Sequence, residues 1–422
     1  APLDSNGIIQ DLTYVMILKD FEKDVTIQKP KDYNREEFIC SYNSSECLNS
    51  EQKLWPKENL ISYGRLPNGK VMINWPIHGN DYYVNSIEMD EQNRSFHFQK
   101  AKEKSLRFLY FLQTELGYNN LSLDYDEFST KDGFPKIPYH RESRRIKGKS
   151  TLSLNYIKDP YNQELRLYRT GIAVGDYPVD HHHYAHPNYK DLPKLDFYPI
   201  PSYSVPLGAL LPQNIKNFIV IEKSISVSNL VNGTTRLQPV VMQIGQASGV
   251  LAALSILQKK NVEDVNIRDV QLELLKNNGY IQPFVDIKTS HPSFISIQKV
   301  GACGILKGTG INIGWENKTL FYPEKKLEKD DLDGLKDYYD LALYPFPEKA
   351  SIENVFTWIK KVDEKISLNL QDLDKEWKRL GLKNYLLKRN INKAEFAVLI
   401  DNFLDPFSRF NIDYNGKLIF ND

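Results

Sequence analysis

The stretch from residue 217 to 257 constrains the fold of this chain most strongly. It opens with the short apolar run Phe218–Ile221, which is typical of a buried strand. From about Pro239 it continues as an apolar helix in which glycine, alanine and serine recur, and the intervening turn is expected at Asn232-Gly233. Small residues let other groups approach a backbone closely, so this helix favours either tight packing on a sheet or contact with a ligand.

This segment resembles the closing portion of the flavin-binding domain in a family of FAD-dependent oxidoreductases, whose members are often labelled as xanthan lyases. The positions that match are Asn217, Arg236, Gly245, Gln246, Ala247, Gly249, Ala252 and Ala253. The family has Gly-Arg after the strand, whereas this chain has Glu222-Lys223. The resemblance implies FAD as the cofactor. The residues that it implies as FAD contacts are Arg236, Gly245, Gln246, Ala247 and Gly249.

The nucleotide-binding half of such a domain has no counterpart in the sequence. Dinucleotide-binding domains begin with a strand, a glycine-rich turn and a helix, whose N–H groups hold the pyrophosphate. No G-x-G-x-x-G occurs among these 422 residues. The chain therefore resembles the C-terminal portion of a flavoprotein, and a separate N-terminal flavin-binding half is a candidate partner.

The composition narrows the remaining partners and the compartment. Lys+Arg and Asp+Glu both number 54, which gives no case for nucleic acid as a partner. No apolar run reaches the ~20 residues of a membrane span. The N-terminus shows no signal peptide, so we expect the chain to be cytoplasmic or to have lost its signal, and a secreted or periplasmic location is favoured if a signal has been removed. Cys40 and Cys47 could form a disulfide in an oxidising compartment.

Histidines gather at one place in the chain. His181, His182, His183 and His186 follow directly on Asp180. Imidazole titrates near neutral pH, so such a cluster suits acid–base work, metal binding or no function at all in a solvated loop. In an extended segment His181 and His183 share a face. The family has D-x-H here, which implies that His182, oriented by Asp180, takes a substrate proton, and that His181 and His183 contact substrate; no metal site is predicted.

A basic cluster forms the second motif. Its sequence R-E-S-R-R-x-x-G matches the family from Arg141 to Arg145 and at Gly148. Taken alone it could be a solvated charged face, although arginine forks also recognise carboxylates and phosphates. The resemblance implies that Arg141 and Arg145 bind or polarise substrate, and that Glu142 and Arg144 help to bind it.

A third motif runs from Asn74 to Tyr83. Trp75 with Asn80 and Asp81 could form a sugar-binding platform with polar hooks. Trp75 could equally be a core anchor beneath a turn. Both interpretations remain open on the sequence.

The motifs change after residue 283. Phe284-Val285-Asp286, the stretch 304–308 and Phe321-x-Pro323 are similar to the opening frame of an S-layer homology module. The stretch 392–397 resembles the helix start that normally follows Phe-x-Pro, but an insertion separates the two. We therefore expect residues 1–283 to form an oxidoreductase-like body and residues 284–422 a mostly helical domain.

Together these patterns predict an α/β (α+β) protein, with a partial flavoprotein-type body, a β-rich substrate portion and a helical C-terminal domain. Local patterns predict a strand pair within 8–30, a short helix at 34–40, a helix over 101–116, and strands near 151–156 and 171–177. The predicted function is FAD-dependent oxidation of a polar, carbohydrate-derived substrate, which is either a small molecule or a glycan. The alternatives are a non-enzymatic glycan-binding or surface protein that has lost flavin, and a polysaccharide lyase.

Overall fold

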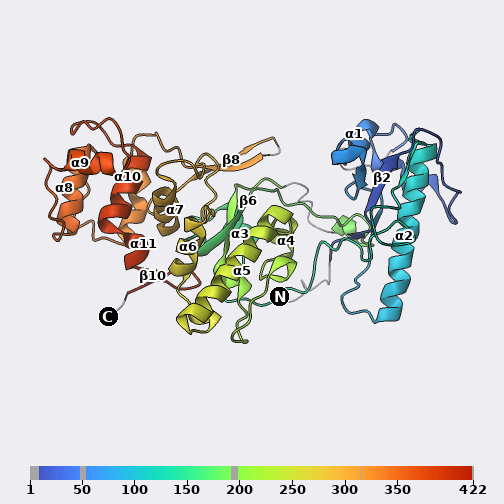
Figure 1. Cartoon of the computed structure of the whole chain (residues 1–422), viewed down its shortest axis with the longest axis horizontal. Coiled ribbons are helices and arrows are strands. Elements are labelled where there is room, and N and C mark those ends of the chain that lie inside the picture. The colour runs from blue at the N-terminus through green and yellow to red at the C-terminus, as the bar shows by residue number, and fades with distance from the viewer. Residues whose placement is uncertain (1–8, 48–53, 192–197, 315, 421–422) are drawn as a thin grey trace. The chain divides into compact units, whose positions relative to one another are not determined.

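The computed structural model describes residues 9–47, 54–191, 198–314 and 316–420 (Figure 1). They form two compact units. Unit 1 comprises residues 145–180 and 196–422, and unit 2 comprises residues 2–144 and 181–195. The chain passes between the units after Arg144 and again after Asp180. Both sides of the division expected at residue 283 lie in unit 1, so that position is not a boundary between the two units.

Unit 2 is built on small antiparallel sheets. Strand β2 (Met16–Asp20) is central in one sheet, between β3 (Val71–Ile73) and β5 (Leu121–Leu123). Strand β1 (Leu12–Thr13) pairs instead with β4 (Asp81–Tyr82). The expected strand pair within 8–30 is therefore wrong. Its apolar run divides after Thr13, and each half pairs with a strand from further along the chain.

A long helix covers this part of unit 2. Helix α2 spans Glu91–Thr114, with the short helix α1 (Lys57–Ser62) nearby in the fold. Asp90 caps α2, since its carboxylate accepts a hydrogen bond from Asn93 N at 2.8 Å. The helix starts before residue 101, where the sequence predicted its start. The first turns are mostly polar and lack the apolar spacing on which that prediction was based. Apolar spacing marks only the half that packs into the core, where Phe108 and Phe111 are fully buried.

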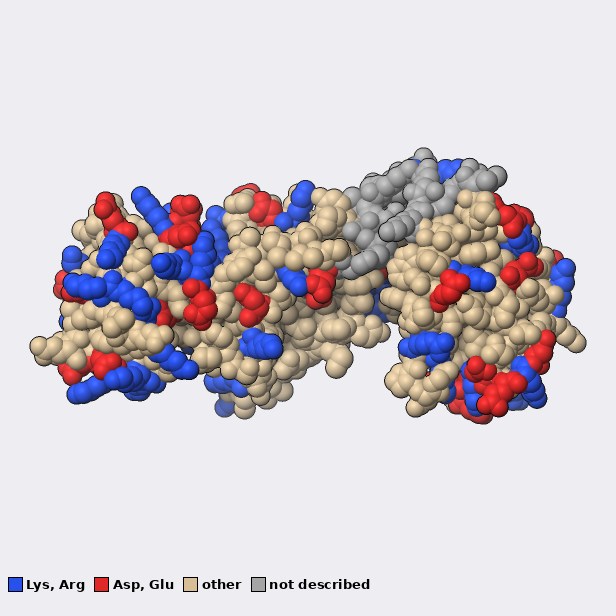
Figure 2. Space-filling view, turned by 90° about the horizontal axis from the view of Figure 1, so that it is seen from above, with Lys and Arg blue, Asp and Glu red and all other residues tan. Residues whose placement is uncertain are grey.

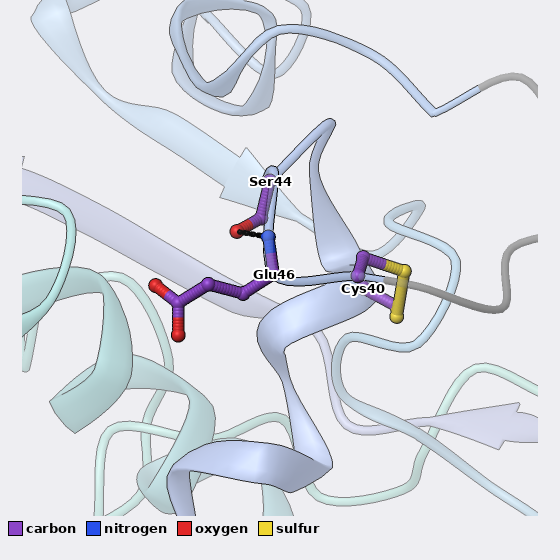
Figure 3. Close-up of a disulfide and its surroundings, with 4 residues drawn as sticks. Cys40, Ser44 and Glu46 are labelled. Atoms are coloured by element: carbon purple, nitrogen blue, oxygen red, sulfur yellow. Dashed lines mark hydrogen bonds between the residues drawn. A yellow bond between two sulfur atoms is a disulfide. The ribbon is translucent and has the colours of Figure 1, made fainter.

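Cys40 and Cys47 form a disulfide in unit 2, as Figure 3 shows. Two 3₁₀ turns, η1 (Arg35–Glu37) and η2 (Ile39–Ser41), replace the helix expected over 34–40. Within the loop that the disulfide closes, Ser44 Oγ accepts a hydrogen bond from Glu46 N at 3.2 Å. A disulfide of this kind is typical of proteins from oxidising compartments.

In unit 1, helix α5 (Gln238–Gln258) packs on β6 (Gly171–Gly175), which pairs with β7 (Tyr203–Pro206). The contact is close, because a Cβ at Gly175 would lie 2.9 Å from Val240 Cγ2. Gln243 reinforces it, since its side-chain amide exchanges two hydrogen bonds of 3.0 Å with the backbone of Val174. Helix α6 (Ile267–Lys276) packs against α5 (Figure 1).

Three local expectations in unit 1 are wrong. The strand expected near 151–156 is largely replaced by helix α3 (Leu154–Lys158), and Asn232-Gly233 lies inside helix α4 (Asn229–Thr235). The run Phe218–Ile221 belongs to no strand among the described residues. Phe218 and Ile221 are 51% and 48% exposed, and Val220 N donates a backbone hydrogen bond to Leu210 O at 2.8 Å without a strand ladder being formed.

The C-terminal part of unit 1 is mostly helical, with small hairpins. Its helices and strands are α7 (Phe294–Cys303), β8 (Thr309–Ile313), β9 (Glu316–Leu320), α8 (Ile352–Val362), α9 (Leu373–Arg379), α10 (Lys393–Leu399), α11 (Pro406–Arg409), β10 (Asn411–Ile412) and β11 (Leu418–Ile419). The Asp286 carboxylate accepts hydrogen bonds from Phe321 N at 2.9 Å and Tyr322 N at 2.7 Å. Ala394 N donates to Pro323 O at 3.0 Å. The motif segments of this region thus lie together, despite the insertion that separates them in sequence.

The described residues therefore have an α/β (α+β) fold, as predicted. All the named strand pairs in this part of the chain are antiparallel. Charges of both signs are interspersed over the face shown in Figure 2. Within the described residues, α5 alone is long and apolar enough to cross a membrane, which is weak evidence because core helices pass the same test. No clear membrane span follows.

Candidate functional site

Unit 2 contains a buried network of charged groups centred on Asp81. The antiparallel pair β1–β4 sets Thr13 opposite Asp81, and Thr13 Oγ1 donates a hydrogen bond to the carboxylate. His182 Nδ1 lies 2.6 Å from Asp81 Oδ2, and Arg141 Nη2 lies 3.2 Å from Oδ1. One carboxylate therefore contacts a hydroxyl, an imidazole and a guanidinium from three separate segments of the chain.

Arg141 is held firmly in this network. Its Nη1 donates to Asp11 O and to Thr13 Oγ1, both at 2.8 Å, and its Nη2 donates to Asn74 O at 2.9 Å. Its side chain is 1% exposed. Because its donors are directed at the protein's own backbone and at Asp81, Arg141 acts as the buried counter-charge of the network.

The charge of Asp81 determines how His182 is held. Burial pushes the pKa of Asp81 upward, but the charges of Arg141 and His182 outweigh it and lower the pKa to about 2. An ionised carboxylate beside Nδ1 favours the ring tautomer with its proton on that nitrogen. This arrangement makes Nε2 the atom of His182 suited to accept a proton from another molecule.

Asp11 is a second buried carboxylate in the same network. Its Oδ2 accepts a hydrogen bond from Ala185 N at 3.0 Å, whereas Oδ1 is buried without a hydrogen-bond partner. Burial, with the charge of Asp81 added, raises the pKa of Asp11 to about 7. At neutral pH, Asp11 is therefore a carboxyl group poised between its charged and neutral forms.

Replacing Asp11 by asparagine should stabilise unit 2 at high pH. The pKa of Asp11 is raised on folding, so the stability that this carboxyl contributes is full below about pH 4 and is lost as the pH rises through about 7. Asparagine stays neutral, keeps an acceptor for Ala185 N and avoids that loss. We expect Asp11→Asn to be more stable than the native protein by up to a few kcal/mol at about pH 8.

Thermal unfolding at about pH 8 and about pH 5 checks this expectation. The gain should shrink at the lower pH, where the native Asp11 is itself mostly protonated. An equal effect of the substitution at both pH values would show that Asp11 does not titrate as described.

The other clustered histidines lie around this network. The rings of His181 and His183 are 4.9 Å apart, as the extended segment predicts, and His186 contacts the ring of Tyr83 at 4.5 Å. Burial, with His181 next in effect, lowers the pKa of His183 to about 3, so that this ring is neutral at physiological pH. Within the described ranges, no group of three or more His, Cys, Asp or Glu side chains is arranged to hold a metal ion.

Asp180, which the resemblance assigns to orienting His182, has a partner in its own unit. Its Oδ2 lies 2.9 Å from Arg236 Nη2 and accepts a hydrogen bond from Tyr177 Oη at 3.3 Å. Both Asp180 and Arg236 are buried. The carboxylate hydrogen-bonded to His182 Nδ1 is that of Asp81. The sequence analysis predicted both His182 and Asp81 as site residues, but it assigned the role of orienting His182 to Asp180.

Helix α5 presents an open backbone where the resemblance expects flavin. A Cβ added at Gly245 or at Gly249 would meet nothing within 4 Å, and Gln246 between them is exposed. Ala247 is fully buried and packs in the core. The exposed face of α5 therefore leaves room for a flat group such as the flavin ring, whereas packing in the core accounts for the buried small residues Ala247 and Ser248.

Glu222 takes the place of a family glycine and keeps a backbone conformation that favours glycine. Its φ is +63°, in the left-handed region, where a side chain costs roughly 1–2 kcal/mol. Glu222→Gly should therefore raise the free energy of unfolding by roughly 0.5–1 kcal/mol, after the entropy of glycine is deducted. Urea unfolding measures this gain. Glu222→Ala is the matched control and should give none, because alanine retains the Cβ; an equal gain would contradict the strain.

The remaining predicted residues occupy varied positions. Arg144 forms an exposed ion pair with Glu88, at 2.7 Å, while Arg145 belongs to unit 1. Glu142 is buried and accepts a hydrogen bond from Gln10 N at 3.0 Å.

Two further predicted residues have structural contacts. Asn80 is buried, and its side-chain amide donates to Tyr14 O at 3.0 Å, which makes it an anchor of the sheet. Trp75 lies against Trp55 and Tyr63, with ring centroids 4.7 Å apart in each case. Tyr63 is exposed, so this aromatic cluster reaches the surface.

The sequence did not identify Asp11 and Thr13 as members of the network. Their sequence positions could have indicated a polar network, because Thr13 lies within an otherwise apolar run and Asp11 directly precedes that run. A carboxylate in a buried strand is costly unless it is paired, so it points to a polar network.

The comparison with protein families agrees with the chemistry of these residues. The model of the family described as FAD dependent oxidoreductase matches residues 8–274. This range contains Asp11, Asp81, Arg141, His182 and helix α5. No curated protein and no solved structure matches the chain. Since the matched range covers more than half of its residues, this chain belongs to the FAD dependent oxidoreductase family.

Proposed function

We propose that this chain acts in the FAD-dependent oxidation of a polar, carbohydrate-derived substrate, with His182 as the base. The observation that supports this role most is the contact between His182 Nδ1 and the buried Asp81 carboxylate, at 2.6 Å. A carboxylate that orients an imidazole in this way is a recurring device for moving a proton at a hydroxyl group. Oxidation of an alcohol requires removal of that proton.

Each residue of the network has a separate role in this reaction. Asp81 keeps the Nδ1 proton of His182 in place and stabilises the imidazolium that forms when Nε2 accepts the hydroxyl proton. Thr13 and Arg141 hold Asp81, through a hydrogen bond and an ion pair. Thr13 and Arg141 are thus positioning residues, which prevent the carboxylate from rotating away from the ring.

FAD, when bound, accepts the hydride that leaves the substrate carbon. In this chain Gly245, Gln246 and Gly249 on the open face of α5 are the residues that would lie against the flavin ring. Helix α5 begins at Gln238, about two turns before Gly245, so the charge at its N-terminal end does not act on this face, contrary to the expectation that Gly245–Gly249 would form the start of the helix. The buried Arg236 is paired with Asp180, so we assign it to supporting this region rather than to direct contact.

A carbohydrate-derived substrate is supported by the aromatic cluster of unit 2. Trp55, Tyr63 and Trp75 form a partly exposed group of rings, and aromatic faces of this kind stack on sugars. His181 and His183 add polar contacts near His182. The disulfide of unit 2 supports a secreted or periplasmic location.

Binding of FAD to the full-length protein tests the proposal. We expect the purified chain to show a flavin absorption spectrum after incubation with FAD, and to reduce an artificial electron acceptor when polar alcohols derived from sugars are added. A protein that binds no flavin would contradict the proposal. Formation of an unsaturated, ultraviolet-absorbing product from a uronate polysaccharide, with no oxidant present, would instead support the lyase alternative.

A second candidate function is the binding of an acidic glycan by the C-terminal part of unit 1. A pocket of about 390 Å³ lies between the motif segments of this region. Lys307, Lys325 and Lys393 line it, together with Asp330 and Asp331. Lys393 is buried, and its Nζ lies 3.3 Å from Asp331 Oδ1. Lys325 is paired with Glu328 at 2.8 Å, so Lys307 is the lining lysine that we assign to contact with a carboxylated or otherwise anionic sugar. Such binding would agree with the similarity to an S-layer homology module.

Removing two lysines of this pocket should weaken such binding. The double variant Lys307→Ala/Lys325→Ala should bind an acidic polysaccharide about tenfold or more weakly than the native protein, and the native interaction should weaken with added salt. Calorimetric titration measures both effects. Lys375→Ala is the control, since Lys375 is exposed outside the pocket. Equal binding by all three proteins would rule out the pocket as the site.

A further inference from the structure

Asp11 holds the segment that carries the proposed base. It directly precedes β1, and its backbone N–H donates a hydrogen bond to His182 O at 2.7 Å. Its carboxylate Oδ2 accepts the hydrogen bond from Ala185 N at 3.0 Å. The main chain and the side chain of one residue therefore fix the histidine segment at two points, one at His182 and one three residues beyond it.

Asp11 is itself fixed by the buried cation of the network. Arg141 Nη1 donates to Asp11 O at 2.8 Å, and Arg141 Nη2 lies 3.2 Å from Asp81 Oδ1. The same guanidinium thus holds the carboxylate that contacts the His182 ring and the residue that holds the His182 backbone. The position of the ring relative to Asp81 depends on both contacts.

Asp11 is also coupled to His182 by charge. The charged or titratable groups that face Asp11 are Asp81, Arg141, His182 and Tyr83. Asp81 and Arg141 form an ion pair whose charges cancel, so ionisation of Asp11 leaves one net negative charge near the ring. The charge of His182 favours the ionised form of Asp11. Because such coupling is reciprocal, the ionised Asp11 strengthens proton binding by His182 to the same extent.

We infer that Asp11 is a positioning residue of the oxidation, which fixes the histidine segment through Ala185 N and adjusts the proton affinity of His182 through its own charge. The inference rests on the proposed role of His182 as the base, because Asp11 acts through that ring and not on the substrate. Burial, with the charge of Asp81 added, raises the pKa of Asp11 to about 7. Its charge therefore changes within the physiological range of pH, and His182 binds the substrate proton more strongly above this range than below it.

Nuclear magnetic resonance of the full-length protein with isotope-labelled histidines tests the coupling by charge, without FAD or substrate. The His182 signal, identified by its loss in His182→Ala, should show an inflection at about pH 7 from Asp11 in addition to its own titration. Asp11→Asn should remove that inflection and lower the midpoint of the ring's own titration by about 0.5 pH unit or more. Asp124→Asn is the matched control, since Asp124 is a buried carboxylate of unit 2 outside the network, and it should change neither.

A second pair of variants separates position from charge. Asp11→Asn keeps an acceptor for Ala185 N, whereas Asp11→Ala removes it, so the amide hydrogen of Ala185 should exchange about tenfold faster in the alanine variant. With flavin and substrate present, Asp11→Asn should move the acid limb of the pH–rate profile to lower pH, because a weaker base loses its proton earlier. Asp124→Asn should leave the profile in place.

Several results would overturn the inference. They are a native His182 curve without the inflection, a curve that Asp11→Asn leaves unchanged, equal effects of Asp11→Asn and Asp124→Asn, or equal exchange at Ala185 in the two Asp11 variants. The proposed function fails separately. If the His182 curve and the exchange change as expected but the flavin-loaded protein oxidises no substrate, the coupling of Asp11 to His182 stands without the oxidoreductase. If the native protein oxidises substrate and Asp11→Asn retains its pH–rate profile and its His182 curve, only the assignment of Asp11 is wrong.

Discussion

Replacing Asp81 by alanine should lower the free energy of unfolding of unit 2 by about 3–5 kcal/mol. The substitution leaves Arg141 as a buried cation without its carboxylate, and it removes the acceptor of Thr13 and His182. Arg141 is unable to turn toward solvent, since its other donors are fixed to Asp11 O and Asn74 O. Urea unfolding followed by a probe in unit 2 measures the loss.

Two further variants identify the cause of that loss. Glu88→Ala removes the partner of Arg144 from an exposed ion pair, and it should cost less than about 1 kcal/mol. Asp81→Asn keeps the size of the side chain and should fall between the two. A cost for Asp81→Ala as small as that for Glu88→Ala would contradict the role of Asp81 as the buried counter-ion.

Replacing His182 by alanine should reduce the rate of substrate oxidation by about 10²–10⁴-fold. The variant loses the proposed base for the substrate hydroxyl, while the residues of α5 that we propose to contact flavin remain. We therefore expect unchanged FAD affinity and a large decrease in kcat. Turnover with an artificial acceptor, together with flavin titration, separates the two quantities.

The role of Asp81 in this step has its own readout. Asp81→Asn should decrease kcat and move the pH profile, because an amide no longer stabilises the imidazolium of His182. His291→Ala, a histidine of unit 1 outside the network, should leave both unchanged. Normal turnover by His182→Ala would eliminate His182 as the base.

The pattern of the sequence predicted the fold class because periodicity and small residues are local signals. Helix α5 and strand β6 are near their expected positions for that reason. The pairing of strands was not predictable in the same way. The apolar run at 12–18 divides between two sheets because β1 and β2 pair with strands far away in the chain. Phe218–Ile221 forms no strand with any described residue, although Val220 N donates a backbone hydrogen bond to Leu210 O at 2.8 Å.

The candidate site shows the same limit. Histidine clustering identified His182, and the third motif identified Asp81, but nothing in one sequence shows that residues 101 positions apart share a hydrogen bond. The nearer carboxylate, Asp180, was the natural expectation, and the structure pairs it with Arg236. The contribution of Asp11 depends on burial, which follows from the packed fold and not from residue type.

Anaerobic mixing tests most directly whether this chain oxidises a sugar-derived alcohol with FAD, as we propose. Flavin-loaded, full-length protein is mixed with a panel of sugars and polyols while the visible absorbance of oxidised flavin is recorded. We predict that at least one of these compounds bleaches the flavin, and that His182→Ala slows the bleaching without altering the starting spectrum. A flavin-loaded protein that none of the compounds reduces would contradict the account.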